Sequence, residues 1–255
     1  MSESASVELR GVGVGYGDTV ALADIDLTIE PGEQVAVIGP SGAGKSTLIG
    51  VLNGTVPVTT GAVRLLGRDT ATATRAQLRA VQRRIGTIHQ RFDLVDQLRT
   101  VHNVNAGRLG SWPFWKAAMS LLVPLDVHHA RSALERVGIA DKLHERTGDL
   151  SGGEQQRVAI GRVLVQRPEI ILADEPVASL DPARGKEVMS LLLDLSAAEG
   201  TTLLTSLHDV DMALDKFHRV IGVRAGRILF DKPRSDLRDV DLRALYAFET
   251  VPGPR

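Results

Sequence analysis

The sequence predicts an α/β fold into which a helical segment is inserted, and two observations support this class. Short runs rich in β-branched residues alternate with longer stretches of helical periodicity through most of the 255 residues. Between about 91 and 150 the strand-like runs give way to helical spacing, and they return from residue 170. We therefore expect one core that the helical segment interrupts.

The first third of the chain predicts several strands and one helix. Strands are expected at 7–10 and 23–29. The run at 34–38 is apolar throughout, which is typical of a strand covered on both faces of its sheet. A glycine-rich turn follows this run and leads into a helix at 45–52. Further strands are expected at 62–66 and 85–89.

The rest of the chain predicts first helices and then alternation again. Within the helical segment the clearest helix is 130–137, because Leu134 and Val137 share one face. A second helix is expected at 182–198, where leucine and valine recur at a spacing of three or four residues. A short amphipathic helix is expected after 233, before an end rich in Pro and Gly. The strands expected here are 170–173, 202–206 and 220–223.

Composition excludes several classes of function. The 30 basic and 31 acidic residues leave a net charge of −1, so there is no basic excess of the kind that non-specific nucleic-acid binding requires. With no cysteine, the chain has no disulfide, thiolate metal site or thiol nucleophile. No apolar run approaches the roughly 18–20 residues that would span a bilayer, and the N-terminus lacks the features of a secretory signal. We expect a cytosolic protein that contacts membranes only through a partner, and no nucleic-acid partner.

A glycine-rich loop carries the strongest functional signal. Residues 39–47 read Gly-Pro-Ser-Gly-Ala-Gly-Lys-Ser-Thr, which is a complete G-x-x-x-x-G-K-[ST] motif between an apolar strand and a helix. The glycines let backbone N–H groups turn inward around phosphate oxygens, and the positive end of the helix adds to the attraction. In such a loop Lys45 reaches the β- and γ-phosphates of a nucleotide, and the Ser46 hydroxyl can ligate Mg²⁺.

Two neighbouring carboxylates end a later strand. The run at 170–173 leads directly into Asp174 and Glu175, which delivers both acids to the carboxyl edge of a sheet. Because side chains alternate along a strand, the two acids can take different roles. We expect Asp174 to hold Mg²⁺ and Glu175 to act as general base toward an attacking water.

A second candidate anion site begins a helix at Ser151. The string Leu-Ser-Gly-Gly-Glu-Gln-Gln-Arg at 150–157 combines a good N-cap residue with two glycines at a helix N-terminus. One γ-phosphate does not need two such sites within one chain. A head-to-tail pair of chains does, because each chain can then close the nucleotide of the other.

These three strings together resemble the nucleotide-binding subunit of an ATP-binding cassette (ABC) transporter, and the resemblance covers essentially the whole chain. Residues 151–155 match the signature motif of that family. The resemblance implies a P-loop NTPase (RecA-like) core with a mixed sheet, an N-terminal antiparallel β part and an inserted α-helical subdomain. The implied parts are an ATP-binding core at 1–90 and 158–232, a helical subdomain with the signature at 91–157, and a C-terminal helix and tail at 233–255.

The resemblance also implies roles for single residues. Tyr16 matches the aromatic residue that stacks on adenine, and Gln90 matches the glutamine that senses Mg²⁺ and water at the junction with the helical subdomain. Asp181 lies in the loop that matches the one crossing the dimer interface. His208 matches the histidine that contacts the γ-phosphate. His89, before Gln90, departs from the apolar or aromatic residue expected there.

The expected site is then as follows. The catalytic residues are Glu175, His208 and Gln90. The Mg²⁺ ligands are Ser46, Gln90 and Asp174. The residues that bind ATP are Tyr16, Gly39, Pro40, Ser41, Gly42, Ala43, Gly44, Lys45, Ser46, Thr47, Ser151, Gly152, Gly153, Glu154 and Asp181.

A finer resemblance concerns the cargo. Residues 173–182 and 206–213 are similar to the phosphonate-importer branch of the family, as is the stretch from Asn103 to Trp115. This implies an ATPase that couples ATP binding and hydrolysis to import of phosphonates or related phosphorus oxyanions. The implied partners are a second copy of the chain in an ATP-sandwich homodimer, transmembrane permease subunits and, indirectly, a periplasmic or extracellular binding protein. The implied location is the cytoplasmic face of the membrane.

Three alternatives stay open at this point. The first is an ABC ATPase for another cargo, such as an amino acid, a metal chelate or a lipoprotein. The second is a non-transport ABC protein of DNA repair or translation, although there is no room for a long coiled coil between Ser46 and Ser151, and the chain carries one cassette rather than two. The third is a small-molecule P-loop kinase, which would need neither the signature nor His208.

Overall fold

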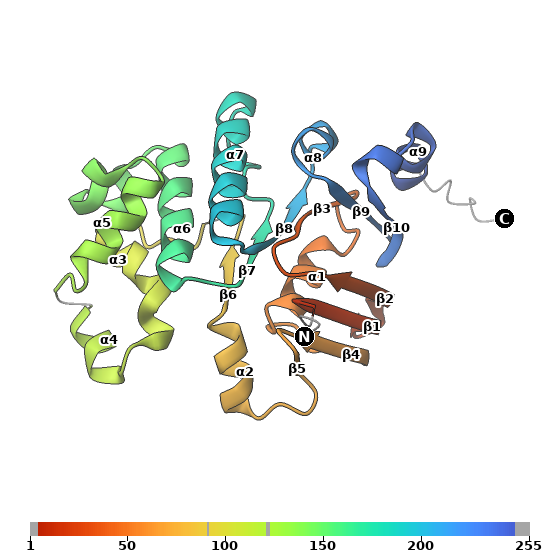
Figure 1. The fold of residues 1–255 in the computed structure, drawn as a ribbon, viewed down its shortest axis with the longest axis horizontal. Coiled ribbons are helices and arrows are strands. Elements are labelled where there is room, and N and C mark those ends of the chain that lie inside the picture. Colours follow the sequence, from red (N-terminus) through yellow and green to blue (C-terminus); the bar gives the residue numbers. More distant parts are fainter. Residues whose placement is uncertain (1–4, 91, 121–122, 248–255) are drawn as a thin grey trace.

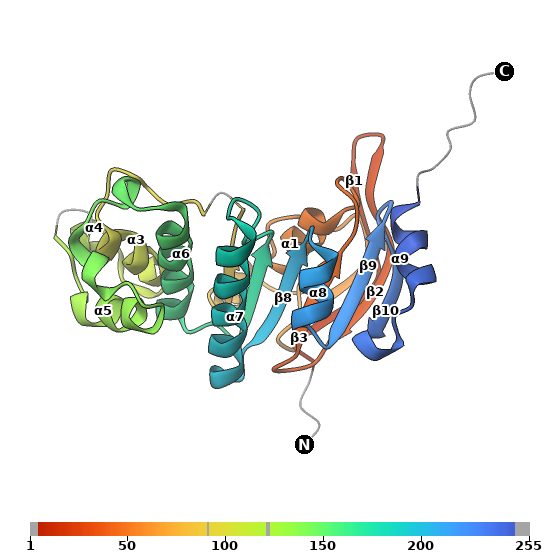
Figure 2. The same ribbon diagram turned by 90° about the horizontal axis from the view of Figure 1, so that it is seen from above.

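The computed structural model describes residues 5–90, 92–120 and 123–247. In the described part of the chain, two sheets are surrounded by helices (Figure 1). The helices α3, α4 and α5 lie together at one end of the long axis, and α9 lies at the other end (Figure 2). Arg91, with which the predicted helical subdomain begins, lies outside the described residues, as do 248–255 of the predicted tail.

The smaller sheet is antiparallel and is formed by the N-terminal part of the chain. Its strands pair in the order β2-β1-β4-β5. The register shifts three times between β1 and β2, so this ribbon is irregular toward its tip. The bounds are β1 Val7–Tyr16, β2 Thr19–Ile29, β4 Thr60–Leu65 and β5 Arg68–Asp69.

The larger sheet is mixed and has the order β10-β9-β3-β8-β7-β6. Strands β3, β6, β7, β8 and β9 are parallel, and β10 pairs antiparallel with β9 at one edge. The carboxyl ends of the parallel strands therefore meet along one edge of the sheet. The bounds are β3 Gln34–Ile38, β6 Ile85–Ile88, β7 Ile170–Asp174, β8 Thr202–Leu207, β9 Arg219–Arg224 and β10 Arg227–Pro233.

Apolar side chains from both faces of the larger sheet are buried. In β3, Ala36 and Ile38 belong to one core and Val35 and Val37 to the other. The first core contains the buried faces of the helices α5, α6 and α7, and the second contains α1 and the antiparallel sheet. Because a strand alternates its side chains between faces, covering both faces requires the continuous apolar run that the sequence shows.

The helical segment packs mainly on one long helix. Helix α6, Gly152–Gln166, contacts α3, α5 and α7. The predicted boundary between 157 and 158 falls within this continuous helix, which joins the helical segment to the core. The other helices are α1 Lys45–Leu52, α2 Arg75–Gln82, α3 Thr100–Asn105, α4 Phe114–Ser120, α5 Val127–Arg136, α7 Pro182–Glu199, α8 Val210–Lys216 and α9 Asp239–Tyr246, with 3-10 turns η1 Ala106–Ser111, η2 Ala140–His144, η3 Thr147–Asp149 and η4 Arg234–Asp236.

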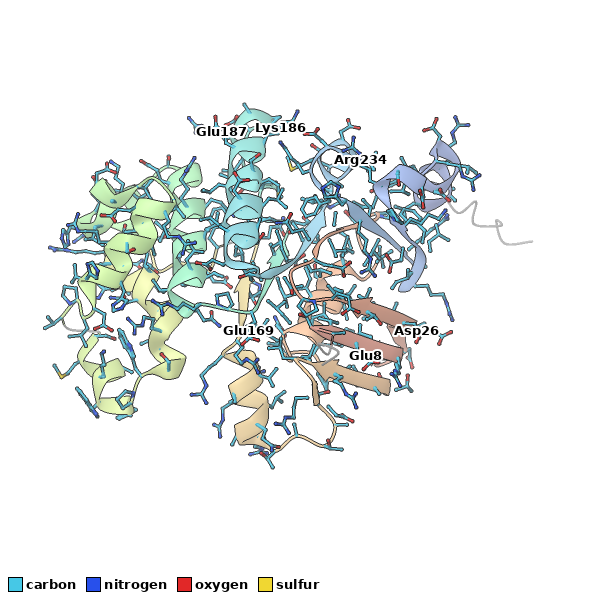
Figure 3. The ribbon with its side chains drawn as sticks, viewed as in Figure 1. Glu8, Asp26, Glu169, Lys186, Glu187 and Arg234 are labelled. Atoms are coloured by element: carbon cyan, nitrogen blue, oxygen red, sulfur yellow. The ribbon has the colours of Figure 1, made fainter. Side chains whose placement is uncertain are left out.

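Charged side chains lie on the outside of these layers. Figure 3 shows Lys186 and Glu187 together at one end of α7, and Asp26 at the margin of the antiparallel sheet. Opposite charges are therefore mixed on the surface, in line with the net charge of −1. Among the described residues, no helix combines the length and the hydropathy that crossing a membrane would require.

Candidate nucleotide-binding and catalytic site

The predicted functional residues gather where the parallel strands of the larger sheet end. The loop 39–44 connects the end of β3 to the start of α1. Asp174 ends the neighbouring β7 and is followed by Glu175, and His208 follows the end of β8. The parallel pairing of β3 with β8 and of β8 with β7 brings these three chain segments side by side.

The backbone of the loop 39–44 requires glycine at two close approaches. A Cβ atom on Gly39 would lie 2.1 Å from the carbonyl oxygen of Val223 in β9. Gly44 has a φ of +107°, and a Cβ atom there would lie 2.8 Å from the carbonyl oxygen of Ala21 in β2. The loop thus packs closely against both sheets. This packing fixes the direction in which α1 presents its N-terminal N–H groups.

Lys45 is buried at the start of α1 and points back along the loop. Its Nζ donates to the carbonyl oxygens of Gly39 at 2.9 Å and Pro40 at 3.3 Å. It also lies 3.7 Å from Oε1 of Glu175. Burial lowers the pKa of Lys45, whereas the Glu175 and Asp174 carboxylates oppose this shift. The neighbouring Ser46 is exposed.

Glu175 lies at the centre of a cluster that it forms with Lys45, His208 and Ser41. Its Oε1 lies 3.2 Å from Nε2 of His208 as well as 3.7 Å from Nζ of Lys45. His208 is about half exposed, and its Nε2 lies 3.4 Å from the Ser41 hydroxyl. Four residues predicted from sequence, two in the loop 39–47 and one after each of two strands, therefore converge in the structure.

Ser206 joins the same cluster, although sequence reasoning did not identify it as functional. Its hydroxyl donates to Oδ1 of Asp174 at 2.6 Å and accepts the backbone N–H of Glu175 at 2.9 Å. The residue is completely buried in β8. The signal that could have revealed it is a serine within the predicted strand 202–206, because a hydroxyl buried in a sheet needs a partner.

The 151–154 string forms a capping box at the start of α6. The Ser151 hydroxyl accepts the N–H of Glu154 at 3.4 Å, and the Glu154 carboxylate accepts the N–H and the hydroxyl of Ser151, each at 2.8 Å. The hydroxyl and then the backbone N–H of Ser151 hold the pKa of Glu154 below its ordinary value. Ser151 and Gly152 are exposed, and Gly153 is partly exposed. Among the described residues, no hydrogen bond or ion pair joins this motif to Glu175, Lys45 or His208.

Three other predicted residues also stand apart from the cluster. Tyr16 is 54% exposed at the end of β1, and Gln90 is exposed two residues beyond the end of β6. Asp181 caps α7 by accepting the N–H of Arg184. Within the described part of the chain, Tyr16 and Gln90 have no side-chain hydrogen bond. Their expected roles all require a nucleotide or a second chain.

The segment after Gln90 is held by a half-buried arginine that sequence reasoning missed. Arg162 of α6 donates to the carbonyl oxygens of Asp93 and Phe92, each at 2.7 Å. Both acceptor residues have positive φ angles, 48° and 60°, so this turn needs external support. Burial lowers the pKa of Arg162. An arginine within an apolar helix pattern was the signal available in the sequence.

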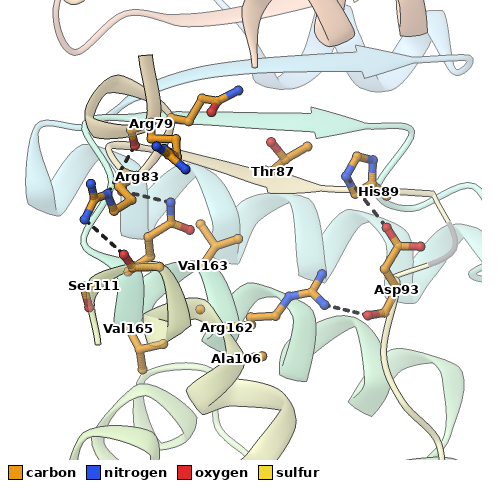
Figure 4. A pocket seen from close by; sticks show the side chains of 14 residues that line it. Arg79, Arg83, Thr87, His89, Asp93, Ala106, Ser111, Arg162, Val163 and Val165 are labelled. Atoms are coloured by element: carbon orange, nitrogen blue, oxygen red, sulfur yellow. Dashed lines mark hydrogen bonds and ion pairs between the residues drawn. The ribbon is translucent and has the colours of Figure 1, made fainter. Parts of the chain in front are cut away.

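A cleft of about 590 Å³ opens beside this segment, between α2, β6, η1 and α6. Figure 4 shows Arg79 and Arg83 on one wall, and Arg162 reaching Asp93 on the other. His89 lies 3.7 Å from the carboxylate of Asp93. His89, which stands where the family resemblance implies an apolar or aromatic residue, thus places an imidazole on the cleft wall.

The chain resembles known proteins along nearly its whole length. The family profile described as ABC transporter matches residues 22–178. A phosphonates import ATP-binding protein of Pseudomonas aeruginosa is 48% identical over 251 residues, covering 98% of this chain and 94% of that protein. One of Lactobacillus delbrueckii is 44% identical over 92% of this chain and 93% of that protein.

Solved structures agree with this assignment. A dimeric bacterial ABC transporter cassette is 29% identical with a TM-score of 0.77, covering 89% of this chain and 98% of that one. A cassette of the cbiONQ transporter complex from Clostridium perfringens is 27% identical with a TM-score of 0.78, covering 91% and 90%. With a family profile across more than half of its residues and close relatives along almost all of them, this chain belongs to the ABC transporter family.

Proposed function

We propose that this chain is the ATP-hydrolysing subunit of an ABC importer for phosphonates. The observation that carries the catalytic part is the convergence of Lys45 and His208 on Oε1 of Glu175 at the edge of the sheet. The names of the relatives, which are phosphonates import ATP-binding proteins, support the cargo. The chain works at the cytoplasmic face of a membrane through its partners.

ATP binds at the loop 39–47. The N–H groups at the start of α1 and the ammonium group of Lys45 hold the β- and γ-phosphates, and the closely packed loop keeps them in one orientation. Tyr16, exposed at the end of β1, stacks on the adenine. These contacts bind the phosphate groups as well as the base.

The residues present fit a magnesium ion that arrives with the nucleotide. Ser46, Asp174 and Gln90 offer only oxygen donors, which Mg²⁺ prefers. The described residues contain no group of three or more acidic or histidine side chains that could cage a metal ion. Mg²⁺ is commonly bound by one or two carboxylates together with substrate phosphates, so an incomplete protein cage suits it. When bound, it would neutralise charge on the phosphates.

Hydrolysis depends on Glu175 as the general base. Its carboxylate accepts a proton from the water that attacks the γ-phosphorus in line with the leaving group. His208 and Lys45 fix one carboxylate oxygen, which leaves the other for the water. No covalent intermediate is needed, because positioning and electrostatic stabilisation suffice for phosphoryl transfer to water.

The active unit is a head-to-tail pair of chains. Ser151 and Gly153 of one chain cap the γ-phosphate held by the loop 39–47 of the other, with Asp181 at the same interface. The exposure of Ser151 at the N-terminus of a long helix supports this arrangement. Because the capping contacts require the γ-phosphate, the affinity between the two chains depends on ATP.

The permease docks beside the Gln90 segment. The cleft of about 590 Å³ lies between the core and the helical segment, and its wall includes Asp93 from the turn that follows Gln90. A conformational change at Gln90 can therefore displace a permease segment that is bound in this cleft. A binding protein outside the membrane delivers the cargo to the permease and contacts this chain only indirectly.

The test is uptake of a labelled alkylphosphonate by cells that carry this protein as the only copy. Lys45→Ala should abolish uptake, because the phosphate contacts are lost. Lys216→Ala, which removes a lysine at the far end of α8, is the matched control and should leave uptake unchanged. Phosphate and amino-acid uptake should persist in both variants. Phosphonate uptake that survives Lys45→Ala would remove phosphonates as the cargo.

A further inference from the structure

One buried hydroxyl connects the two functional carboxylates of β7. Ser206 in β8 lies opposite Asp174 in the strand register. Its Oγ donates to Oδ1 of Asp174 at 2.6 Å and accepts the N–H of Glu175 at 2.9 Å. A hydroxyl has one proton to donate, and here that proton is committed to Asp174.

The hydrogen bond that the Ser206 hydroxyl accepts from the N–H of Glu175 supports a turn of unusual backbone conformation. Glu175 has a φ of +49°, a region that residues other than glycine rarely adopt. The chain turns at this point, and the turn aims the Glu175 carboxylate at His208 and Lys45. A bond to the N–H of Glu175 therefore acts on the direction of that carboxylate as well as on the fold.

The hydrogen bond that the Ser206 hydroxyl donates orients the carboxylate of Asp174. It leaves Oδ2 of Asp174 as the oxygen not engaged by Ser206. Groups that orient a metal-binding carboxylate typically change metal affinity or activity by about 10–100-fold when they are removed. A hydroxyl at 206 is thus well situated to affect both the metal ligand and the base.

The neighbouring residue shows that hydroxyl burial in β8 does not by itself produce such contacts. Thr205 is also completely buried, yet its Oγ1 has no hydrogen-bond partner among the described residues. The two hydroxyls point to opposite faces of the strand. Thr205 therefore provides a matched control for the loss of a buried hydroxyl from β8.

We propose that Ser206 is a positioning residue for ATP hydrolysis. It orients the Asp174 carboxylate that we assign to Mg²⁺, and it fixes the turn that presents Glu175 to the attacking water. This inference rests on the proposed function of the site. It assigns Ser206 no contact with the substrate.

The experiment compares Ser206→Ala, Ser206→Thr and Thr205→Val in the full chain. Ser206→Ala should lower kcat about 10–100-fold and raise the Mn²⁺ concentration needed for half-saturation about 10-fold, measured by electron paramagnetic resonance with adenylyl imidodiphosphate present. Affinity for the analogue in EDTA should change less than about twofold, because the loop 39–47 is intact. Ser206→Thr keeps the hydroxyl and should restore most of both values.

The controls separate positioning from stability. Thr205→Val should match the wild type in both readouts. If Ser206→Ala has the same kcat and Mn²⁺ affinity as Thr205→Val, the proposal is wrong. This holds even if the melting temperature of Ser206→Ala is lower. Should Ser206→Ala not fold, Ser206→Cys, which is similar in size and a weaker donor, is read against the same control. A wild-type protein without ATPase activity would overturn the proposed function, and Mn²⁺ affinity would still decide the role of Ser206.

Discussion

At the scale of single residues, Glu175 combines a strained backbone with a fixed side chain. A non-glycine residue in the left-handed region stores on the order of 1–3 kcal/mol, which the surroundings must offset. Here Ser206 holds the backbone N–H, and His208 and Lys45 hold the carboxylate. The carboxylate is therefore ordered in advance, which in the proposed mechanism lowers the entropy lost when water is positioned for attack.

Glu175→Gln should slow hydrolysis roughly 10²–10⁴-fold while ATP still binds. The amide keeps the size of the side chain and cannot accept the proton of the attacking water. Steady-state phosphate release measures the hydrolysis rate, and fluorescence of a labelled ATP measures binding. Near-normal phosphate release would remove Glu175 from the role of general base.

A site residue could be predicted from the sequence when it lies in a recognisable motif formed by its neighbours in the chain. Lys45 and Glu175 each belong to a short string whose flanking strand and helix are visible in the sequence. Ser206 acts on Asp174 across the β7–β8 pairing, and that register arises only when the sheet assembles. Arg162 likewise supports a turn 69 residues away in the chain. Contacts of this kind have no local pattern to read.

At the scale of elements, the apolar buried strands and the amphipathic helices were the predictable part. Strand β3 and helix α1 have the bounds that the sequence predicted. Among the described residues, the elements that were not predicted include α2, β5, β10 and α8. In α2, which has eight residues, only Val81 is buried, and in β10 only Phe230, so each of these elements buries a single side chain. Helix α8 has seven residues, which is too short for a clear pattern.

The link between η1, α4 and α5 depends on one acidic residue. Oδ2 of Asp126 lies 2.9 Å from both Nη1 of Arg108 and Nζ of Lys116. The two cations also lie over the ring of Trp112, at 5.9 and 4.8 Å from its centroid. The hydrogen bond from Lys116, aided by the charges of Lys116 and Arg108, lowers the pKa of Asp126. This cluster attaches α4 to the rest of the helical segment.

Asp126→Asn should destabilise the protein by about 1 kcal/mol at pH 7. Asparagine tolerates the positive φ at this position, so the backbone should not change. Because the folded pKa of Asp126 is lowered, its stabilisation is present above the unfolded pKa and is lost as pH falls through the folded value. The difference between variant and wild type, measured by urea unfolding, should therefore shrink below about pH 4. A difference that stays constant with pH would contradict the assignment to charge.

At the scale of the whole molecule, α6 connects two regions that we propose to be functional, the Ser151 motif and the turn after Gln90. Its N-terminus carries the exposed Ser151, and its later turns carry Arg162, which holds the turn after Gln90. A rigid helix transmits displacement along its axis, so contact of Ser151 with another chain can alter the cleft beside α2. The separation of Ser151 from the Glu175 cluster within one chain is thus consistent with a site completed by two chains.

Ser151→Arg should abolish ATP-dependent dimerisation while leaving nucleotide binding by the single chain almost unchanged. A long cation at the helix N-terminus is repelled by the positive end of the helix and fills the space that the γ-phosphate of the partner would occupy. Light scattering in the Glu175→Gln background, where ATP persists, measures the dimer. Ser132→Arg, an exposed serine on α5, adds the same charge elsewhere and should dimerise normally. An ATP-dependent dimer of Ser151→Arg would refute the assignment of Ser151 to the interface and, with it, the two-chain site.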